Sequence, residues 1–175
     1  RQADARIAQL TLDEKISFMR GYSSFFFYGV PEKGMPYIYL SDATQGVHMR
    51  DNLSDPTMVR QLERSTAFPC PISLAATFNP SLAYRYAVGE ECRAGGIEVL
   101  LGPGMNIYRN SQNGRNFEYM GEDPLLASAM VAEYVKGMQS TGTVACLKHF
   151  ICNETEFYRR RSNSIVDERA LHELY

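Results

Sequence analysis

Short apolar runs alternate with capped amphipathic stretches along this 175-residue chain, and this alternation constrains the fold more than any other feature. Four runs of β-forming or apolar residues predict strands near residues 37–41, 72–75, 97–101 and 143–148. No two-residue hairpin signal joins them, so we expect a helix between strands and a parallel sheet. Four such units are about half of an eight-unit β/α barrel, which needs about 250 residues. The sequence therefore predicts an α/β fold in which the four strand–helix units form part of a barrel that is not closed within this chain.

Capping signals mark where the intervening helices begin. Thr11-Leu12-Asp13-Glu14 has the form of a capping box, and Leu12, Ile16 and Met19 then fall on one helical face. Asn79-Pro80 and Asp123-Pro124 each place a cap before a proline at the first helical position. We expect these two helices to continue to the glycines at 95–96 and to the glycine at 142, and a last helix to open at residues 167–169.

The stretch from residue 100 to residue 124 contains a long predicted loop that carries candidate functional side chains. An apolar run breaks at Gly102-Pro103-Gly104, and roughly twenty residues rich in Asn, Gln and Arg follow. Such a loop after a strand is typical of an α/β enzyme site. Residues 22–36 are also predicted to be loop, and residues 52–64 a surface loop or a short helix.

Composition narrows the class of partner. The net charge of −2 gives no reason to expect nucleic acid or an anionic membrane, and no apolar run is long enough to span a bilayer. The cysteines form no C-x-x-C pair and no common zinc spacing, and buried free thiols are the simplest interpretation. The redox compartment stays open, with a periplasmic or secreted location favoured over a cytoplasmic one.

Gly102-Pro103-Gly104 is not a dinucleotide motif, and no G-x-S-x-G, H-E-x-x-H or P-loop is present.

Polar side chains cluster where the predicted strands end. Parallel strands bring their carboxyl ends to one rim, so these groups can converge. An Asp accepts hydrogen bonds from two neighbouring hydroxyls, while Lys, Arg and His donate, a combination that suits a neutral polyol. The candidates are Asp42 after the first strand, Arg109, Arg115, Asn116 and Glu118 after the third, and Lys148, His149, Asn153, Glu156 and Arg159 after the fourth.

Each of these residues also has a purely structural interpretation. Asp42 could cap a turn, Arg115 and Glu118 could form a local ion pair three residues apart, and His149 could be a hydrogen-bonded core histidine. The run of arginines at 159–161 is typical of a solvated surface, and Glu122 fits the start of a helix better than a catalytic pair.

Three motifs taken together resemble the family 3 glycoside hydrolases, in the β-glucosidase branch. They are the segments at 114–118 (G-R-N-F-E), with Glu122-Asp123-Pro124 after it, at 148–159 (Lys148-His149-Phe150 to Arg159) and at 166–169 (V-D-E-R). The resemblance runs from residue 10 to residue 175. It implies a TIM-like barrel domain, and it implies that five residues hold the sugar in the −1 subsite: Asp42, Arg115, Lys148, His149 and Arg159.

Two departures from the family pattern bear on function. The family motif D-G-P-x-G-V-R appears here without its Gly-Pro, as Asp42-Ala43-Thr44-Gln45-Gly46-Val47 followed by His48-Met49-Arg50, so the loop after Asp42 can bend differently. The family's nucleophilic Asp and its acid/base Glu both fall beyond Tyr175, so no catalytic carboxylate is expected within this chain. The β-N-acetylhexosaminidase branch is disfavoured because Ile151-Cys152-Asn153 stands where that branch has a G-H-G motif.

The resemblance implies an exo-acting, retaining β-glucosidase, with residues 1–175 forming the first half of its barrel domain without an internal boundary. We expect no metal or organic cofactor. The expected partners are a β-linked glucoside or small oligosaccharide, and the rest of the enzyme or a second copy covering the open barrel edge. A β-xylosidase of the same family and a non-catalytic carbohydrate-binding or structural fragment remain alternatives.

Overall fold

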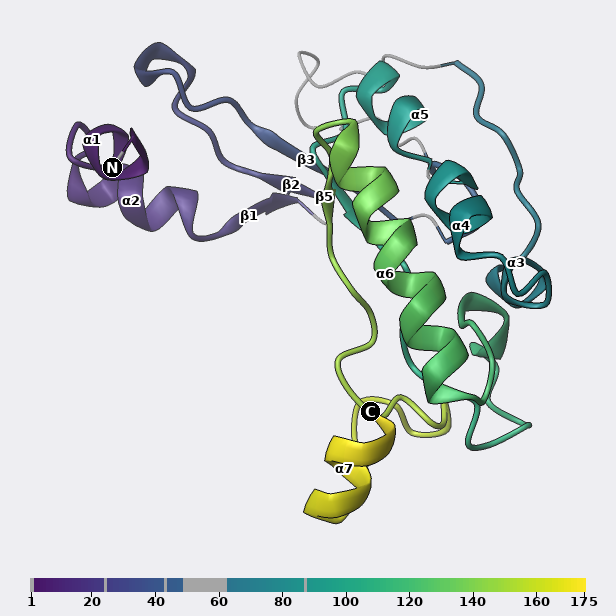
Figure 1. Cartoon of the computed structure of the whole chain (residues 1–175). Helices are drawn as coiled ribbons and strands as arrows, with labels where there is room; N and C mark the ends of the chain where they lie inside the picture. Colours follow the sequence, from purple (N-terminus) through teal and green to yellow (C-terminus); the bar gives the residue numbers. More distant parts are fainter. Residues whose placement is uncertain (1, 24, 43, 49–62, 87) are drawn as a thin grey trace.

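A computed structural model describes residues 2–23, 25–42, 44–48, 63–86 and 88–175 of the chain (Figure 1). Most of the segment at 52–64, predicted to be surface loop or short helix, lies outside these residues. Among the described residues, no helix is both long enough and apolar enough to cross a membrane.

One sheet forms the centre of the described structure. Its strands lie in the order β1 (Gly21–Ser23), β2 (Phe26–Phe27), β3 (Ile38–Asp42), β4 (Val99–Leu101) and β5 (Val144–Ala145). The strands β3, β4 and β5 are parallel, with Leu40 opposite Val99 and Leu100 opposite Ala145. The predicted strands at 37–41, 97–101 and 143–148 are therefore confirmed, although each is shorter or shifted. The α/β class is confirmed, and the sheet is open rather than closed into a barrel.

The N-terminal part of the sheet differs from the prediction. The strand β2 runs antiparallel to both β1 and β3, so the expected loop at 22–36 and the wholly parallel sheet are both wrong. Aromatic residues explain the pairing, because Phe26 lies opposite Tyr39 and their rings stack at 4.6 Å between centroids. A 3₁₀ turn, η1 (Pro31–Lys33), then leads back to β3.

The predicted strand at 72–75 is also wrong, because this segment is the helix α3 (Pro71–Ala75). Cys70 is extended and Pro71 takes the first helical position, where its missing N–H costs no hydrogen bond. The helix buries Leu74 and Ala75. A short apolar run of four residues fits a buried strand and a buried helical turn equally well, and the proline decides between them.

Three helices pack side by side on one face of the sheet, as Figure 1 shows: α4 (Pro80–Tyr86), α5 (Gly89–Ala94) and α6 (Pro124–Ser140). Asp123 caps α6 as predicted, accepting from the Leu125 amide at 2.7 Å. The single helix predicted from 80 to 95 is two helices. A β-carbon at Gly89 would lie 2.4 Å from the Thr141 hydroxyl oxygen, so glycine permits the contact with the end of α6 but weakens a continuous helix.

The helices α1 (Gln2–Ile7) and α2 (Leu12–Phe18) form an N-terminal arm that lies apart from the helices α3 to α6 (Figure 1). The capping box at Thr11 and Glu14 is confirmed, with each side chain accepting from the other residue's amide. The predicted apolar face is not buried, since Leu12, Ile16 and Met19 are 71%, 56% and 83% exposed.

The long loop after β4 contains a 3₁₀ turn, η2 (Asn116–Glu118), and the chain ends with α7 (Glu168–Leu174), capped by Asp167. A groove of about 460 Å³ with mostly apolar walls lies between α6, the residues after β5 and α7; its lining includes Val131, Val135, Leu147 and Leu174. Coverage of the open barrel edge by more protein or by a second copy stays a prediction, as does the assignment of residues 1–175 to a single domain.

Candidate functional site

Two residues predicted from separate strands meet at the carboxyl edge of the sheet. Asp42 is the last residue of β3, and Lys148 follows β5 and continues its parallel pairing through a bridge to Gly104. The Lys148 ammonium nitrogen lies 2.6 Å from an Asp42 carboxylate oxygen, although the residues are 106 positions apart. The parallel order of β3, β4 and β5 is what places the two side chains at one edge.

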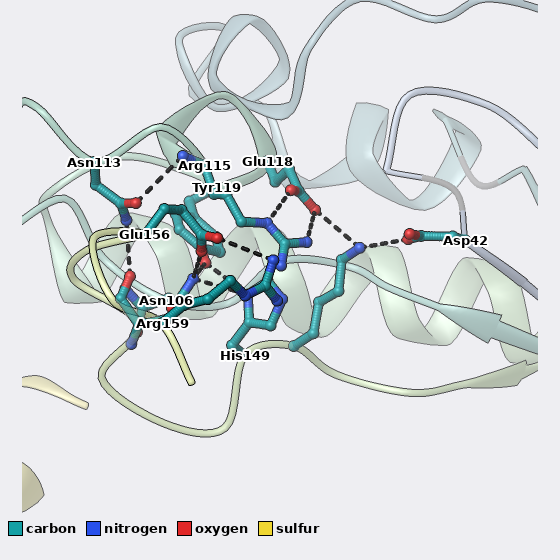
Figure 2. Close-up of polar contacts among 11 residues, drawn as sticks. Asp42, Asn106, Asn113, Arg115, Glu118, Tyr119, His149, Glu156 and Arg159 are labelled. Carbon is teal, nitrogen blue, oxygen red and sulfur yellow. Dashed lines mark hydrogen bonds and ion pairs between the residues drawn. The ribbon is translucent and has the colours of Figure 1, made fainter. Parts of the chain in front are cut away.

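Glu118 joins this pair to Arg115. One oxygen of Glu118 lies 2.8 Å from the Lys148 ammonium nitrogen, and Arg115 donates through Nε and Nη2 at 2.5 and 2.9 Å (Figure 2). The Glu118 side chain is only 6% exposed. Its burial favours the neutral acid, but the hydrogen bonds from Arg115 and Lys148 outweigh burial and lower the pKa of Glu118. Charges therefore alternate from Asp42 through Lys148 and Glu118 to Arg115; we call these four residues the rim cluster.

His149 joins the same region through a tyrosine. Its Nδ1 lies 2.6 Å from the hydroxyl oxygen of Tyr119, a ring with no exposed surface. Burial, together with the positive charges of Arg115 and Lys148, lowers the pKa of His149 to about 4. The imidazole is therefore neutral at pH 7.

Arg159 reaches the region indirectly. Its guanidinium pairs with Glu156 at 3.0 Å, and the other Glu156 oxygen accepts from the Asn153 amide at 3.1 Å. The same Asn153 amide donates to the Tyr119 hydroxyl at 2.8 Å. Of the five predicted residues, Arg115 and Lys148 thus meet at Glu118, and Asp42 joins them through Lys148. His149 and Arg159 are linked to each other through Tyr119, Asn153 and Glu156 (Figure 2).

Two buried asparagines hold the loop that carries Asn153. Asn106 exchanges hydrogen bonds with the Asn153 backbone, accepting from its N–H at 3.0 Å and donating to its carbonyl at 3.3 Å. The Asn113 amide donates to the same carbonyl at 2.7 Å. The loop after β5 is therefore bonded to the loop after β4 through three hydrogen bonds to the Asn153 backbone.

An open cavity of about 400 Å³ lies beside the rim cluster and is lined in part by Asp42, Gly46, His48, Phe117 and Glu118. The Asp42 side chain is 43% exposed, so its carboxylate can accept from a bound molecule while Lys148 remains paired with Glu118. This arrangement can bind hydroxyl groups through both acceptors and cationic donors. Within the described part of the chain, no cluster of three or more His, Cys, Asp or Glu side chains is arranged to hold a metal ion.

Sequence reasoning missed the role of Tyr119 and of the supporting Asn106 and Asn113. It treated Glu118 as a local partner of Arg115, which the structure shows, but not as a partner of Lys148 thirty residues later. Tyr119 directly follows the G-R-N-F-E motif that ends at Glu118, and that adjacency was the available signal.

Comparison with known proteins identifies relatives over most of the chain. The model of the "Glycosyl hydrolase family 3 N terminal domain" matches residues 55–169. A Bacteroides ovatus protein named Beta-glucosidase BoGH3A is 44% identical over 95% of this chain and 23% of its own length. An Exo-alpha-(1->6)-L-arabinopyranosidase of Bifidobacterium longum is 38% identical over 97% of this chain and 23% of its own length.

Solved structures agree with this match. The structure of β-glucosidase 3B from Thermotoga neapolitana in complex with glucose superposes with a TM-score of 0.89 and 38% identity, covering 100% of this chain and 26% of that one. A β-glucosidase of Bifidobacterium adolescentis superposes with a TM-score of 0.83 and 37% identity, over 97% of this chain and 24% of the other. The chain thus spans about a quarter of the length of the relatives it matches.

Proposed function

Because this chain belongs to glycosyl hydrolase family 3, we propose that it is part of an exo-acting, retaining β-glucosidase-like enzyme. In this proposal Asp42, Arg115, Lys148, His149 and Arg159 bind the sugar of the −1 subsite. The nucleophile and the acid/base carboxylate lie outside residues 1–175. Retaining hydrolysis needs two such carboxylates about 5–5.5 Å apart, one acting as nucleophile and one as acid and then base.

The observation that carries the proposal is the position of Lys148 between Asp42 and Glu118. Glu118 forms ion pairs with Arg115 and with Lys148. Asp42 pairs with Lys148 alone in this cluster, and its carboxylate is partly exposed beside an open cavity. A carboxylate in that position accepts hydrogen bonds from two neighbouring sugar hydroxyls. Contacts of this kind that strengthen toward the oxocarbenium-like transition state raise the rate as well as the affinity.

A second candidate substrate has support from one relative. The Bifidobacterium longum protein, nearly as similar as the β-glucosidases, is named for an L-arabinopyranoside. A β-xylosidase of the same family would use the same hydroxyl contacts on a pyranose without the C6 hydroxymethyl group. An α-L-arabinopyranosidase would in addition have to accept a 4-hydroxyl of the opposite configuration. A non-catalytic carbohydrate-binding protein is the alternative of a different class.

The test is a panel of aryl glycosides with the full-length protein. We expect hydrolysis of the β-D-glucoside with the highest kcat/KM, less of the β-D-xyloside and α-L-arabinopyranoside, and none of the α-D-glucoside. Proton NMR of the first product should show β-glucose, the retained anomer. Glucose binding without hydrolysis of any substrate would replace the proposal with the non-catalytic alternative.

A matched pair of lysine variants tests the site. Lys148→Met removes the cation between Asp42 and Glu118, so kcat/KM for the preferred glycoside should fall sharply. Lys136→Met makes the same change on the exposed face of α6, where Lys136 pairs with Glu133, and should leave kcat/KM unchanged. Equal effects of the two variants would contradict the site. The isolated chain 1–175 should show no turnover.

A further inference from the structure

The inference concerns the hydrogen-bond state of His149, and it starts from Asn153. The Asn153 side-chain amide lies 3.1 Å from Glu156, whose other oxygen is 3.0 Å from the Arg159 guanidinium. A carboxylate that pairs with an arginine accepts hydrogen bonds through its oxygens. The NH₂ group of Asn153, rather than its carbonyl oxygen, must therefore face Glu156.

The orientation of Asn153 decides the direction of the next hydrogen bond. The same NH₂ group is 2.8 Å from the Tyr119 hydroxyl oxygen, so Tyr119 accepts from Asn153. A tyrosine hydroxyl has one proton to donate, and the remaining close partner is His149 Nδ1 at 2.6 Å. Burial raises the pKa of Tyr119, so the hydroxyl keeps this proton at neutral pH.

The Tyr119 hydroxyl thus donates to His149 Nδ1. The Asn153 amide nitrogen also lies 3.5 Å from Nδ1, but its two hydrogens are directed to Glu156 and to Tyr119. A nitrogen that receives the Tyr119 hydrogen bond is an acceptor, which excludes a proton on Nδ1 and places the proton of the neutral ring on Nε2. The nearby charges do not reverse this: Arg115 and Lys148 oppose an imidazolium, while Glu118 and Glu156 favour it less strongly. No hydrogen bond to Nε2 is present among the residues that the structure describes.

We propose that Tyr119 and Asn153 are positioning residues that fix His149 as the neutral Nε2–H tautomer, so that His149 presents an N–H donor. If the proposed function holds, on which this last step rests, the donor is used for a sugar hydroxyl. The effect resembles the way a metal-bound histidine is oriented by the hydrogen bond at its other nitrogen. Arg159 and Glu156 contribute by holding the Asn153 amide in its orientation.

The direct test is ¹⁵N NMR of the full-length protein labelled at histidine, with His149 assigned by comparison with His149→Gln. At pH 7 we expect an unprotonated Nδ1 and a protonated Nε2. A protonated Nδ1 in the wild-type protein would overturn the proposal. This readout needs no substrate and no activity.

Two variants test the direction of the hydrogen bonds. Asn153→Asp replaces the donor with an acceptor, so Tyr119 should donate to residue 153 and His149 should carry its proton on Nδ1. Tyr119→Phe removes the donor, and the Nδ1 resonance should shift toward that of a free imidazole with mixed tautomers. Tyr108→Phe is the matched control, because the Tyr108 ring lies 6.5 Å from that of Tyr119, centroid to centroid, and takes no part in these bonds. An unchanged tautomer in both test variants contradicts the proposal.

Kinetics and sugar binding separate this inference from the proposed function. Loss of one oriented hydrogen bond should lower kcat/KM of Tyr119→Phe by about 2- to 10-fold, with Tyr108→Phe unchanged. Added glucose should shift the Nε2 resonance of the wild-type protein more than the Nδ1 resonance. If no glycoside is hydrolysed and glucose shifts neither nitrogen, the proposed function fails while the Nε2–H assignment stands on the NMR result alone.

Discussion

Two glutamates in this chain have similar partners and different surroundings. Glu14, in the N-terminal arm, accepts from the Lys33 ammonium at 2.5 and 2.7 Å and from the Thr11 amide. Glu118, in the rim cluster, accepts from Lys148 and Arg115 over almost the same distances. In both, the hydrogen bonds lower the pKa of the carboxyl group. Contact geometry alone does not distinguish them.

The exposure of the side chains to solvent distinguishes the two glutamates. The Glu14 and Lys33 side chains are each about a quarter exposed, so water solvates both charges when the pair separates. Glu118 and Lys148 are 6% and 12% exposed, and water cannot replace a lost partner there. The rim cluster therefore depends on each of its members, whereas the arm pair does not. The following predictions measure this difference, beginning with the largest effect.

The largest effect is expected on activity, at the exposed end of the rim cluster. On the proposed function, Asp42→Ala in the full-length protein should lower kcat/KM for an aryl β-glucoside by roughly 10² to 10⁴, because the proposed site would lose two charge-assisted hydrogen bonds to the sugar. Glu122→Ala, at the start of α6, should change it little. Steady-state kinetics of both variants decide the matter, and a loss smaller than tenfold for Asp42→Ala would remove Asp42 from the site.

The next effect is on stability, at the buried centre of the cluster. Glu118→Ala leaves the Arg115 guanidinium without its carboxylate and Lys148 with only one, so the free energy of unfolding should fall by about 3–5 kcal/mol. Glu133→Ala breaks the exposed pair with Lys136 and should cost about 0–1 kcal/mol. Denaturant unfolding of both variants gives the comparison. Similar losses would mean that burial does not set the strength of these pairs.

The third prediction concerns pH, because the same surroundings oppose a charge on His149. Its pKa is lowered from 6.5 to about 4, so between these values the unfolded chain binds the proton and the folded chain does not. The contribution of His149 to stability should be full above pH 6.5 and decrease as the pH falls toward 4. His149→Gln should flatten this part of the curve of unfolding free energy against pH. A pKa near 6.5 from NMR titration of His149 would contradict the expectation.

The smallest effect is expected in the N-terminal arm. Glu14→Gln keeps the shape of the side chain and removes the charge that Lys33 contacts, and water should compensate for most of the loss. Thermal unfolding should therefore shift much less than for Glu118→Gln, and the small shift should vanish in high salt. A shift as large as that of Glu118→Gln would erase the contrast between the two regions.

The N-terminal arm and the rim cluster also differ in how well the sequence predicts their contacts. Thr11 and Glu14 are three residues apart, and the hydrogen bonds between them follow from a local capping rule, as does the cap of α6 by Asp123. The strands β3, β4 and β5 were also predictable, because β-forming runs and intervening helices impose a parallel order. The order of the strands then brought Asp42 and Lys148 together.

The parts that sequence reasoning missed depend on tertiary contacts. The helix α3 looks like a strand until Pro71 is placed at its first position, and β2 pairs through aromatic contacts with β3 rather than through a turn signal. The partnership of Glu118 with Lys148, and that of Tyr119 with His149, each join residues thirty positions apart. No local pattern specifies such a pair, because it exists only when the loops after β4 and β5 are folded together.

The reciprocal bonds between Asn106 and Asn153 have a consequence for loop engineering. Exchanging residues 150–161 alone for those of a relative would leave the buried Asn106 and Asn113 side chains facing a backbone of altered shape. Each unsatisfied buried polar group costs about 1–3 kcal/mol. The loops after β4 and β5 are separated in the sequence by the helix α6, and they would therefore have to be replaced together.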